Sequence, residues 1–228
     1  MIIIRNARTR CVLQKAVPLL IIPLVVLLGA VLLRGQHYLL ISFAVALLSL
    51  LLFIAGFEKK QTGARRLVIA AVMTALCIAG RFIPLFKPIT ALTVITAIYL
   101  GGETGFLVGA LSALLSNFSF GQGPWTPFQM LAWGLIGLLA GALSKPLEKS
   151  KWLLCIFGVL CGIAYSFIMD IWTVLWYSSG LDATLYLSAI VTALPHTILY
   201  AVSNFLFLYL FAKPFGEKMT RIKLKYGV

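Results

Sequence analysis

The chain has 228 residues, of which 61% are hydrophobic and only 11% are charged, and its mean hydropathy is +1.03. Soluble domains are typically about 45–50% apolar and about 25% charged, so this composition excludes an ordinary soluble domain and predicts an all-α integral membrane protein. The formal net charge of +13 does not indicate nucleic-acid binding, because Lys and Arg cluster between apolar runs and not along one exposed face.

Eight apolar runs are candidates for membrane spans, which need about 20 residues each. Basic residues precede the first run, as they would in a signal peptide. The run is long for that role, and Leu-Leu-Arg-Gly follows it where a small-residue cleavage site is needed, so we expect a retained span. The eight runs are residues 17–33, 38–57, 67–83, 89–100, 105–116, 128–143, 152–176 and 185–211.

The basic residues also predict the orientation of the spans. The N-terminus, residues 59–66, residues 145–151 and the C-terminal tail hold most of them, whereas the opposite side has Arg34, Arg81 and Lys87. Positively charged connections stay in the cytoplasm. With eight spans, both termini are therefore expected to be cytoplasmic.

A change of composition divides the chain. The first two runs are almost purely aliphatic, whereas later runs contain Gly, Thr, Asn, Gln, Trp and Asp. We therefore expect a two-helix membrane appendage in residues 1–60, a six-helix functional core in residues 61–216 and a basic cytoplasmic tail in residues 217–228.

Residues 116–130 differ most from their surroundings. Gly121, Gly123, Pro124 and Pro127 interrupt any helix there, because glycine costs about 1 kcal/mol and proline about 3 kcal/mol in a helix interior. Amides and aromatic residues fill the same stretch. It is either the external mouth of a binding site or an interfacial turn with a Trp anchor.

The third run carries small residues every fourth position, at Ala71, Ala75 and Ala79. Such a row lets a second helix approach closely. The partner is either another protein subunit or a helix of the same bundle. The glycines at 105, 109, 137 and 141 have the same spacing, and we expect them to pack within the chain.

Three ionisable residues lie in or beside later runs. Asp170 is acidic within an apolar run, so it either contacts a ligand, pairs with Arg81 or lies at the membrane interface. His196 follows Pro195, where the helix is expected to kink. Packing or hydrogen bonding is the safer interpretation of His196, and a ligand contact stays open. Glu103 is expected to stabilise the start of the fifth span.

Catalytic and metal-binding patterns are missing from the sequence. It has no GxxxxGK[ST], HExxH or GxSxG motif, no CxxC pair and no span with two acidic residues. We therefore expect no enzyme activity, no metal site and no ATP hydrolysis by this chain.

Residues 65–211 resemble the S-component, or substrate-binding subunit, of energy-coupling factor (ECF) vitamin transporters. The resemblance rests on the alanine row, on Ile89–Asn117 and most strongly on Phe120-Gly-Gln-Gly-Pro-Trp-Thr-Pro-Phe-Gln-Met-Leu-Ala-Trp-Gly-Leu-Ile-Gly137. The last run is similar to a subgroup associated with cobalamin uptake. The first two spans lie outside the resemblance, so their role is open.

The resemblance implies a function and partners. An S-component in a prokaryotic cell membrane captures a vitamin outside and delivers it inward, together with a transmembrane scaffold subunit (EcfT-type) and two cytoplasmic ATPases (EcfA-type). The alanine row would dock on the scaffold. Cobalamin or a related corrinoid is the first expected ligand, with a queuosine precursor or pantothenate as alternatives, and a membrane-embedded enzyme as a less favoured function.

Aromatic walls with a few polar groups suit a large, partly apolar ligand. The residues expected to bind it are Asn117, Gln122, Trp125, Thr126, Gln129, Trp133, Asp170, Trp172, Trp176 and His196.

Overall fold

The computed structural model of the chain describes residues 6–32, 37–56, 60–84, 86–178 and 181–227, and in these ranges every regular element is a helix. Each of the eight predicted apolar runs is helical over most of its described residues. The elements are α1 (Ala7–Ala16), the π-helical turn η1 (Val17–Ile21), α2 (Ile22–Leu32), α3 (Tyr38–Ala55), α4 (Lys60–Arg81), α5 (Ile89–Leu100), α6 (Gly102–Phe120), α7 (Thr126–Ala142), α8 (Ser144–Lys149), α9 (Lys151–Tyr177) and α10 (Ala183–Tyr226).

Helices α6 and α10 extend well beyond the runs that the sequence predicts. Helix α6 continues to Phe120, so the first part of the expected break at residues 116–130 is helical. Helix α10 runs through the residues expected to form a basic tail and ends at Tyr226, with Pro195 and Pro214 inside it. The Asp182 carboxylate caps its first turn by accepting from the Thr184 and Leu185 amides, which is a strong helix-start signal.

Four described helical stretches are long and apolar enough to cross a membrane by length and composition: Arg8–Leu32, Tyr38–Ala55, Lys151–Tyr177 and Ala183–Tyr226. Helices α5 and α7 are apolar but shorter. At about 1.5 Å per residue, the 12 residues of α5 reach about 18 Å, less than the hydrocarbon thickness of about 30 Å. The fold is thus that of a multi-pass membrane protein, whereas the eight-span count stays a prediction.

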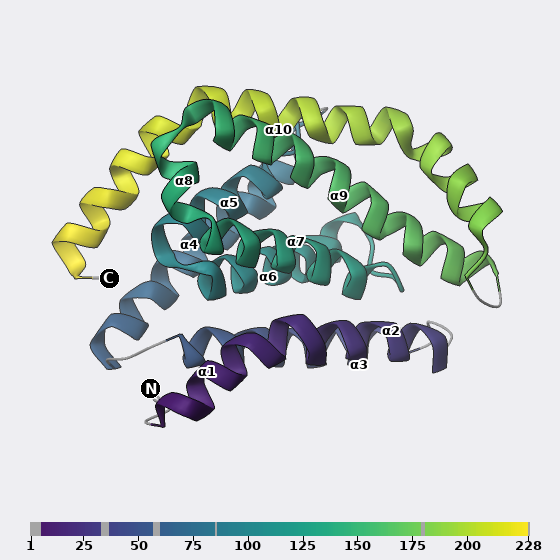
Figure 1. Ribbon diagram of the computed structural model, residues 1–228, viewed down its shortest axis with the longest axis horizontal. Helices are drawn as coiled ribbons and strands as arrows, with labels where there is room; N and C mark the ends of the chain where they lie inside the picture. Colours follow the sequence, from purple (N-terminus) through teal and green to yellow (C-terminus); the bar gives the residue numbers. More distant parts are fainter. Residues whose placement is uncertain (1–5, 33–36, 57–59, 85, 179–180, 228) are drawn as a thin grey trace.

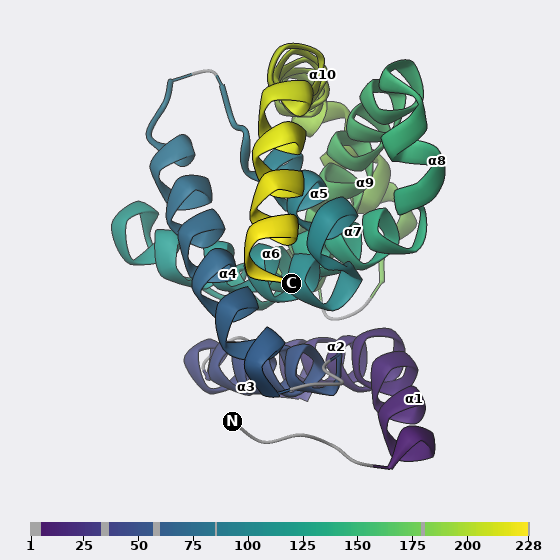
Figure 2. The same ribbon diagram turned by 90° about the vertical axis from the view of Figure 1, so that its left-hand side faces the viewer.

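The helices form layers around a central group (Figure 1). Helices α2 and α3 pack on one side of α6 and α7, and α9 pairs with α10 on the opposite side. Helix α5 lies in the interior, where all of its residues except Tyr99 are buried. Figure 2 shows the C-terminal half of α10 crossing in front of the ends of α5, α6 and α7.

Glycines allow α6 and α7 to pack with their backbones in contact. A Cβ on Gly105 would lie 3.1 Å from the Gly137 Cα, and one on Gly137 would overlap the Gly105 backbone. Gly109 and Gly141 meet the backbones of Trp133 and Gly102 in the same way. The prediction that these glycines pack within the chain is confirmed, and the rigid α6–α7 pair supports the turn between them.

Glu103 links the N-terminal helices to the rest of the bundle. It lies in the first turn of α6, as predicted, where a carboxylate stabilises the helix N-terminus. Its Oε1 also accepts a 2.9 Å hydrogen bond from Gln14 Nε2 of α1. The appendage is therefore joined to the core by a polar contact as well as by apolar packing.

Candidate ligand-binding site

The turn between α6 and α7 has a backbone that its glycines and proline make possible. Gly121 has φ +101°, a conformation that L side chains rarely adopt. The Trp125 ring packs directly on Gly123, so a Cβ there would overlap the indole. Pro127 is the second residue of α7, where its missing N–H costs nothing. The predicted break in the helix is therefore confirmed over residues 121–125.

Side-chain amides around this turn hydrogen-bond one another. Asn117 Nδ2 donates to Thr126 Oγ1 at 2.9 Å and to Gln129 Oε1 at 2.8 Å. Thr126 Oγ1 donates to Gln122 Oε1 at 3.0 Å, and Gln122 Nε2 donates to the Leu114 carbonyl at 2.8 Å. The polar network, as we call Asn117, Gln122, Thr126 and Gln129, thus fixes the turn onto α6.

Arg81, at the end of α4, completes the polar network. Its Nη1 donates to Asn117 Oδ1 at 2.8 Å and to Ser116 Oγ. Its guanidinium carbon lies 4.7 Å from the ring centre of Phe120 and 5.6 Å from that of Trp133, which are cation–π distances. The positive charge is therefore held by amide, hydroxyl and aromatic groups, and it connects α4 to α6.

Below the polar network lies a buried aromatic layer. Gln129 Nε2 donates to the Tyr165 hydroxyl at 3.0 Å. The Tyr165 ring stacks on the Trp133 ring, with 4.6 Å between the ring centres, and meets the Tyr200 ring edge-on, with 5.1 Å between the centres. Trp133 is 1% exposed and donates its Nε1 hydrogen to Thr90 Oγ1 at 3.0 Å. Trp133 is thus a core residue that supports the network from beneath.

A second aromatic group, the indole ladder, joins the turn to α9. The Trp125 ring meets the Trp172 ring edge-on, with 5.7 Å between the ring centres. The Trp172 ring stacks on the Trp176 ring, with 6.2 Å between the ring centres. Trp176 is 47% exposed. The ladder therefore runs from the α6–α7 turn toward the surface, and it brings together three of the tryptophans that the sequence nominated.

Trp172 Nε1, in the indole ladder, and Asp170 Oδ2, two residues earlier on α9, are buried atoms without a hydrogen-bond partner among the described residues. Asp170 is 5% exposed. The expected alternative of an Asp170–Arg81 ion pair is not formed in the described part of the chain, where Arg81 donates to the network instead. Burying such groups unpaired costs about 1–3 kcal/mol each. Residues two positions apart on a helix do not face each other, so of the two atoms we place only the Trp172 N–H donor in the indole ladder.

His196 lies apart from these groups. It is exposed on α10, while the next residue, Thr197, is buried and shares a 2.6 Å hydrogen bond with Ser166 of α9. No group of three or more His, Cys, Asp or Glu side chains that could hold a metal ion occurs among the described residues.

The sequence did not identify several residues of this region. For Arg81 the sequence predicted only a position on the side opposite the basic segments or a pairing with Asp170, and it predicted no role for Tyr165, Tyr200 or Thr90. The one signal for Arg81 was its position, as a basic residue at the end of an apolar run. A hydroxyl within an apolar run was the corresponding signal for Tyr165.

The alanine row lies on an exposed face of α4. Ala71, Ala75 and Ala79 are exposed, as are Val68, which precedes them, and Val72. Helix α4 packs on α5 and α6 through its other face, which includes buried residues 70, 73 and 77. The alanine row is therefore not packed against another described helix of this chain.

A comparison with protein-family models matches residues 61–221 to the family described as the S component of ECF-type riboflavin transporters. No curated protein and no solved structure matches the chain. The family match confirms the S-component resemblance and gives no support to the cobalamin subgroup. S components bind the transported substrate, act with the scaffold and ATPase subunits, and are not enzymes. The chain belongs to the family of ECF-type riboflavin transporter S components.

Proposed function

We propose that this S component captures a flat, aromatic, hydrogen-bonding vitamin beside the indole ladder, and that riboflavin is the first candidate. The observation that carries the proposal is the buried Trp172 Nε1, unpartnered among the described residues, within the stacked indoles. The family name supports the same ligand.

The chemistry of the ladder favours a planar heterocycle. Indole rings contribute large contact area and stack on flat π-systems. An indole N–H donates to a ring carbonyl, and the isoalloxazine of riboflavin has two such carbonyls. A corrinoid has no comparable flat edge with adjacent N–H and carbonyl groups, so the ladder does not favour cobalamin.

The polar network has a positioning role in this proposal. Its amides were expected to contact the ligand, but their hydrogen-bonding groups are committed to one another, to Arg81 and to Tyr165. They hold Trp125 in place through Thr126, its neighbour in the chain. Trp133 supports the network and does not line the ligand site, and His196 lies outside it.

The orientation follows from the positions of the basic segments. Helix α1 begins and α10 ends at the same end of the molecule as α8 (Figure 1), and this end includes the basic residues 145, 149 and 151. We propose that this end is cytoplasmic, that all eight apolar helices cross the bilayer and that the indole ladder opens to the outside. The exposed alanine row would then face the scaffold subunit within the membrane.

The ligand assignment is tested by Trp172→Phe, which keeps an aromatic ring and removes the N–H donor. A lost neutral hydrogen bond is worth about 1–1.5 kcal/mol, so we expect riboflavin to bind about tenfold more weakly. Calorimetry and quenching of flavin fluorescence by the purified protein measure this. Trp152→Phe, an exposed tryptophan of α9 away from the indole ladder, is the matched control.

Unchanged affinity of Trp172→Phe would contradict the site. Absence of any riboflavin binding by the unmodified protein would contradict the ligand. In that case, mass spectrometry of small molecules extracted from freshly purified protein distinguishes a corrinoid, a queuosine precursor and pantothenate by mass.

A further inference from the structure

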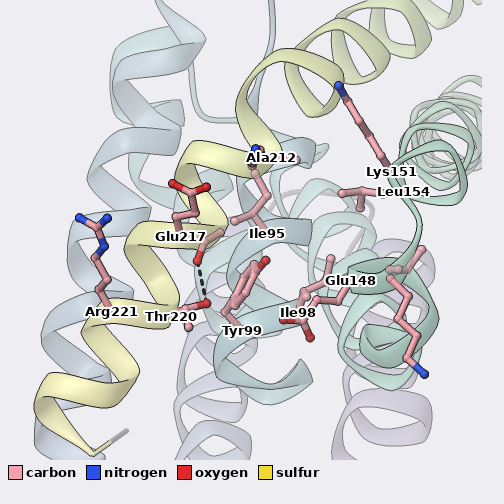
Figure 3. Close-up of a pocket in the computed structure, with 14 residues that line it drawn as sticks. Ile95, Ile98, Tyr99, Glu148, Lys151, Leu154, Ala212, Glu217, Thr220 and Arg221 are labelled. Atoms are coloured by element: carbon pink, nitrogen blue, oxygen red, sulfur yellow. Dashed lines mark hydrogen bonds between the residues drawn. The ribbon is translucent and has the colours of Figure 1, made fainter.

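A cavity of about 570 Å³ lies between α5, the α8–α9 junction and the C-terminal half of α10. It is separate from the indole ladder, at the end of the molecule that carries the basic residues of α8. Figure 3 shows side chains from these three regions around it. Its volume is within the range of about 300–1,000 Å³ that is typical of small-molecule sites.

The floor of the cavity is apolar. Ile95 and Ile98 of α5, Leu154 of α9 and Ala212 of α10 line it. Close packing of Tyr99 against Gly216, where a Cβ would overlap the tyrosine hydroxyl, holds α10 to α5 beside it. This floor offers a hydrocarbon chain a surface already shielded from water.

The rim of the cavity is charged and predominantly basic. Its four basic side chains outnumber two acidic ones, and all six residues are exposed. No ion pair among these six occurs in the described parts of the chain, so their charge is not neutralised internally. The basic residues are Lys149, Lys151, Lys213 and Arg221, and the acidic ones are Glu148 and Glu217.

Aromatic residues outside the cavity indicate its depth in the bilayer. Trp152 is 62% exposed on the outer surface of α9 and α10, and its ring centre lies 5.9 Å from that of Tyr209. The Lys151 ammonium, which also lines the cavity, lies 3.6 Å from the Tyr209 ring centre. Exposed Trp, Tyr and Lys together are typical of the membrane–water interface, so the cavity opens at the level of the lipid headgroups.

We propose that this cavity binds an anionic phospholipid of the cytoplasmic leaflet. The phosphate lies among the rim lysines and Arg221, and an acyl chain covers the floor formed by Ile95, Ile98 and Leu154. Basic cavities between membrane helices on the cytoplasmic side suit such headgroups, and anionic lipids concentrate there. A bound lipid would connect α5, α9 and α10, the helices that meet at this end of the bundle.

The test uses the full chain in mixed bilayer discs of equal phosphatidylglycerol and phosphatidylcholine, followed by native mass spectrometry of the released protein. We expect phosphatidylglycerol to be retained at least about tenfold over phosphatidylcholine, and Lys149→Gln with Lys213→Gln and Arg221→Gln to abolish the preference. The matched control removes three exposed basic residues outside the cavity, by Lys145→Gln, Lys218→Gln and Lys225→Gln.

Equal retention of the two lipids by the unmodified protein would overturn the proposal, as would an equal loss in the control triple variant, since both indicate diffuse attraction. Ala212→Leu narrows the floor without changing charge, and we expect it to lower retention of both lipids. Unchanged retention with normal helix content would contradict acyl-chain binding. Competition by glycerol 3-phosphate at millimolar concentration would indicate a soluble phosphate ligand instead and would also overturn the lipid assignment.

Discussion

Asn117 connects three helices through one side chain. Its Oδ1 accepts from Arg81 of α4, and its Nδ2 donates to Thr126 and Gln129 of α7, while Asn117 itself is in α6 and 1% exposed. A hydrogen-bond network in a low-dielectric interior stabilises the fold most when each of its donors and acceptors has a partner. Replacing this one amide removes three hydrogen bonds and leaves Gln129 Oε1 without its partner among the described residues.

We therefore expect Asn117→Ala to lower the free energy of unfolding by about 2–4 kcal/mol, because loss of a buried hydrogen-bonding partner costs about 1–3 kcal/mol. Thermal unfolding in detergent, followed by circular dichroism, measures the effect. Ser119→Ala is the control, since Ser119 is exposed on the same helix. An equal midpoint for both variants would mean that the network does not stabilise the fold.

Helix α4 shows how one element can serve two contacts. One face carries buried side chains, including Met73 and Cys77, against α5 and α6, whereas the alanine row is exposed. Helices in lipid associate mainly through close packing at small residues. In a helix that we propose to cross the membrane, an exposed row of three small residues is suited to a second subunit, and the proposed scaffold is the candidate.

Ala75→Leu tests this docking role. A leucine in the middle of the row keeps a second helix from close approach, so we expect at least a tenfold loss of co-purified scaffold subunit with unchanged riboflavin affinity of the solitary protein. Leu76→Phe, at an exposed position about 100° around the helix from Ala75, adds bulk beside the row and serves as the control. Co-purification of the Ala75→Leu protein at the normal ratio would exclude docking through this face.

At the scale of the whole molecule, the N-terminal helices cover the α6–α7 pair and leave the alanine row uncovered. Helices α2 and α3 pack against α6 and α7, and Gln14 holds Glu103. The appendage can thus remain bound while α4 contacts another subunit. Figure 1 shows these helices as a layer opposite α9 and α10.

The proposed topology predicts which added cysteines can be labelled from outside the cell. The background variant is Cys11→Ala, which removes the exposed native thiol and leaves three buried ones. Leu181→Cys, at an exposed position before α10, should react with a membrane-impermeant maleimide in intact cells. Lys149→Cys should react only after permeabilisation, because positively charged connections are cytoplasmic. Reaction of both cysteines in intact cells, or of neither, would contradict the eight-span arrangement.

The sequence by itself determined where the apolar helices lie and where the chain breaks at residues 121–125. Long apolar runs favour membrane helices, and glycine and proline disfavour a continuous helix. It also identified the indole residues and Asp170 by their type. Only the tertiary structure decided how each helix is rotated. In α5 and α7 nearly every residue is apolar or small, so no periodicity distinguishes a lipid-facing side chain from a core one.

That rotation accounts for the differences between prediction and structure. Trp133 lies inside the bundle on Tyr165, His196 lies on the exposed side of α10, and Arg81 joins the polar network. Contacts between residues far apart in the chain fix these positions, through the close glycine packing of α6 on α7 and the pairing of α9 with α10. The sequence shows which residue types are present, but it does not show which of them touch. Close packing of the helices decides that.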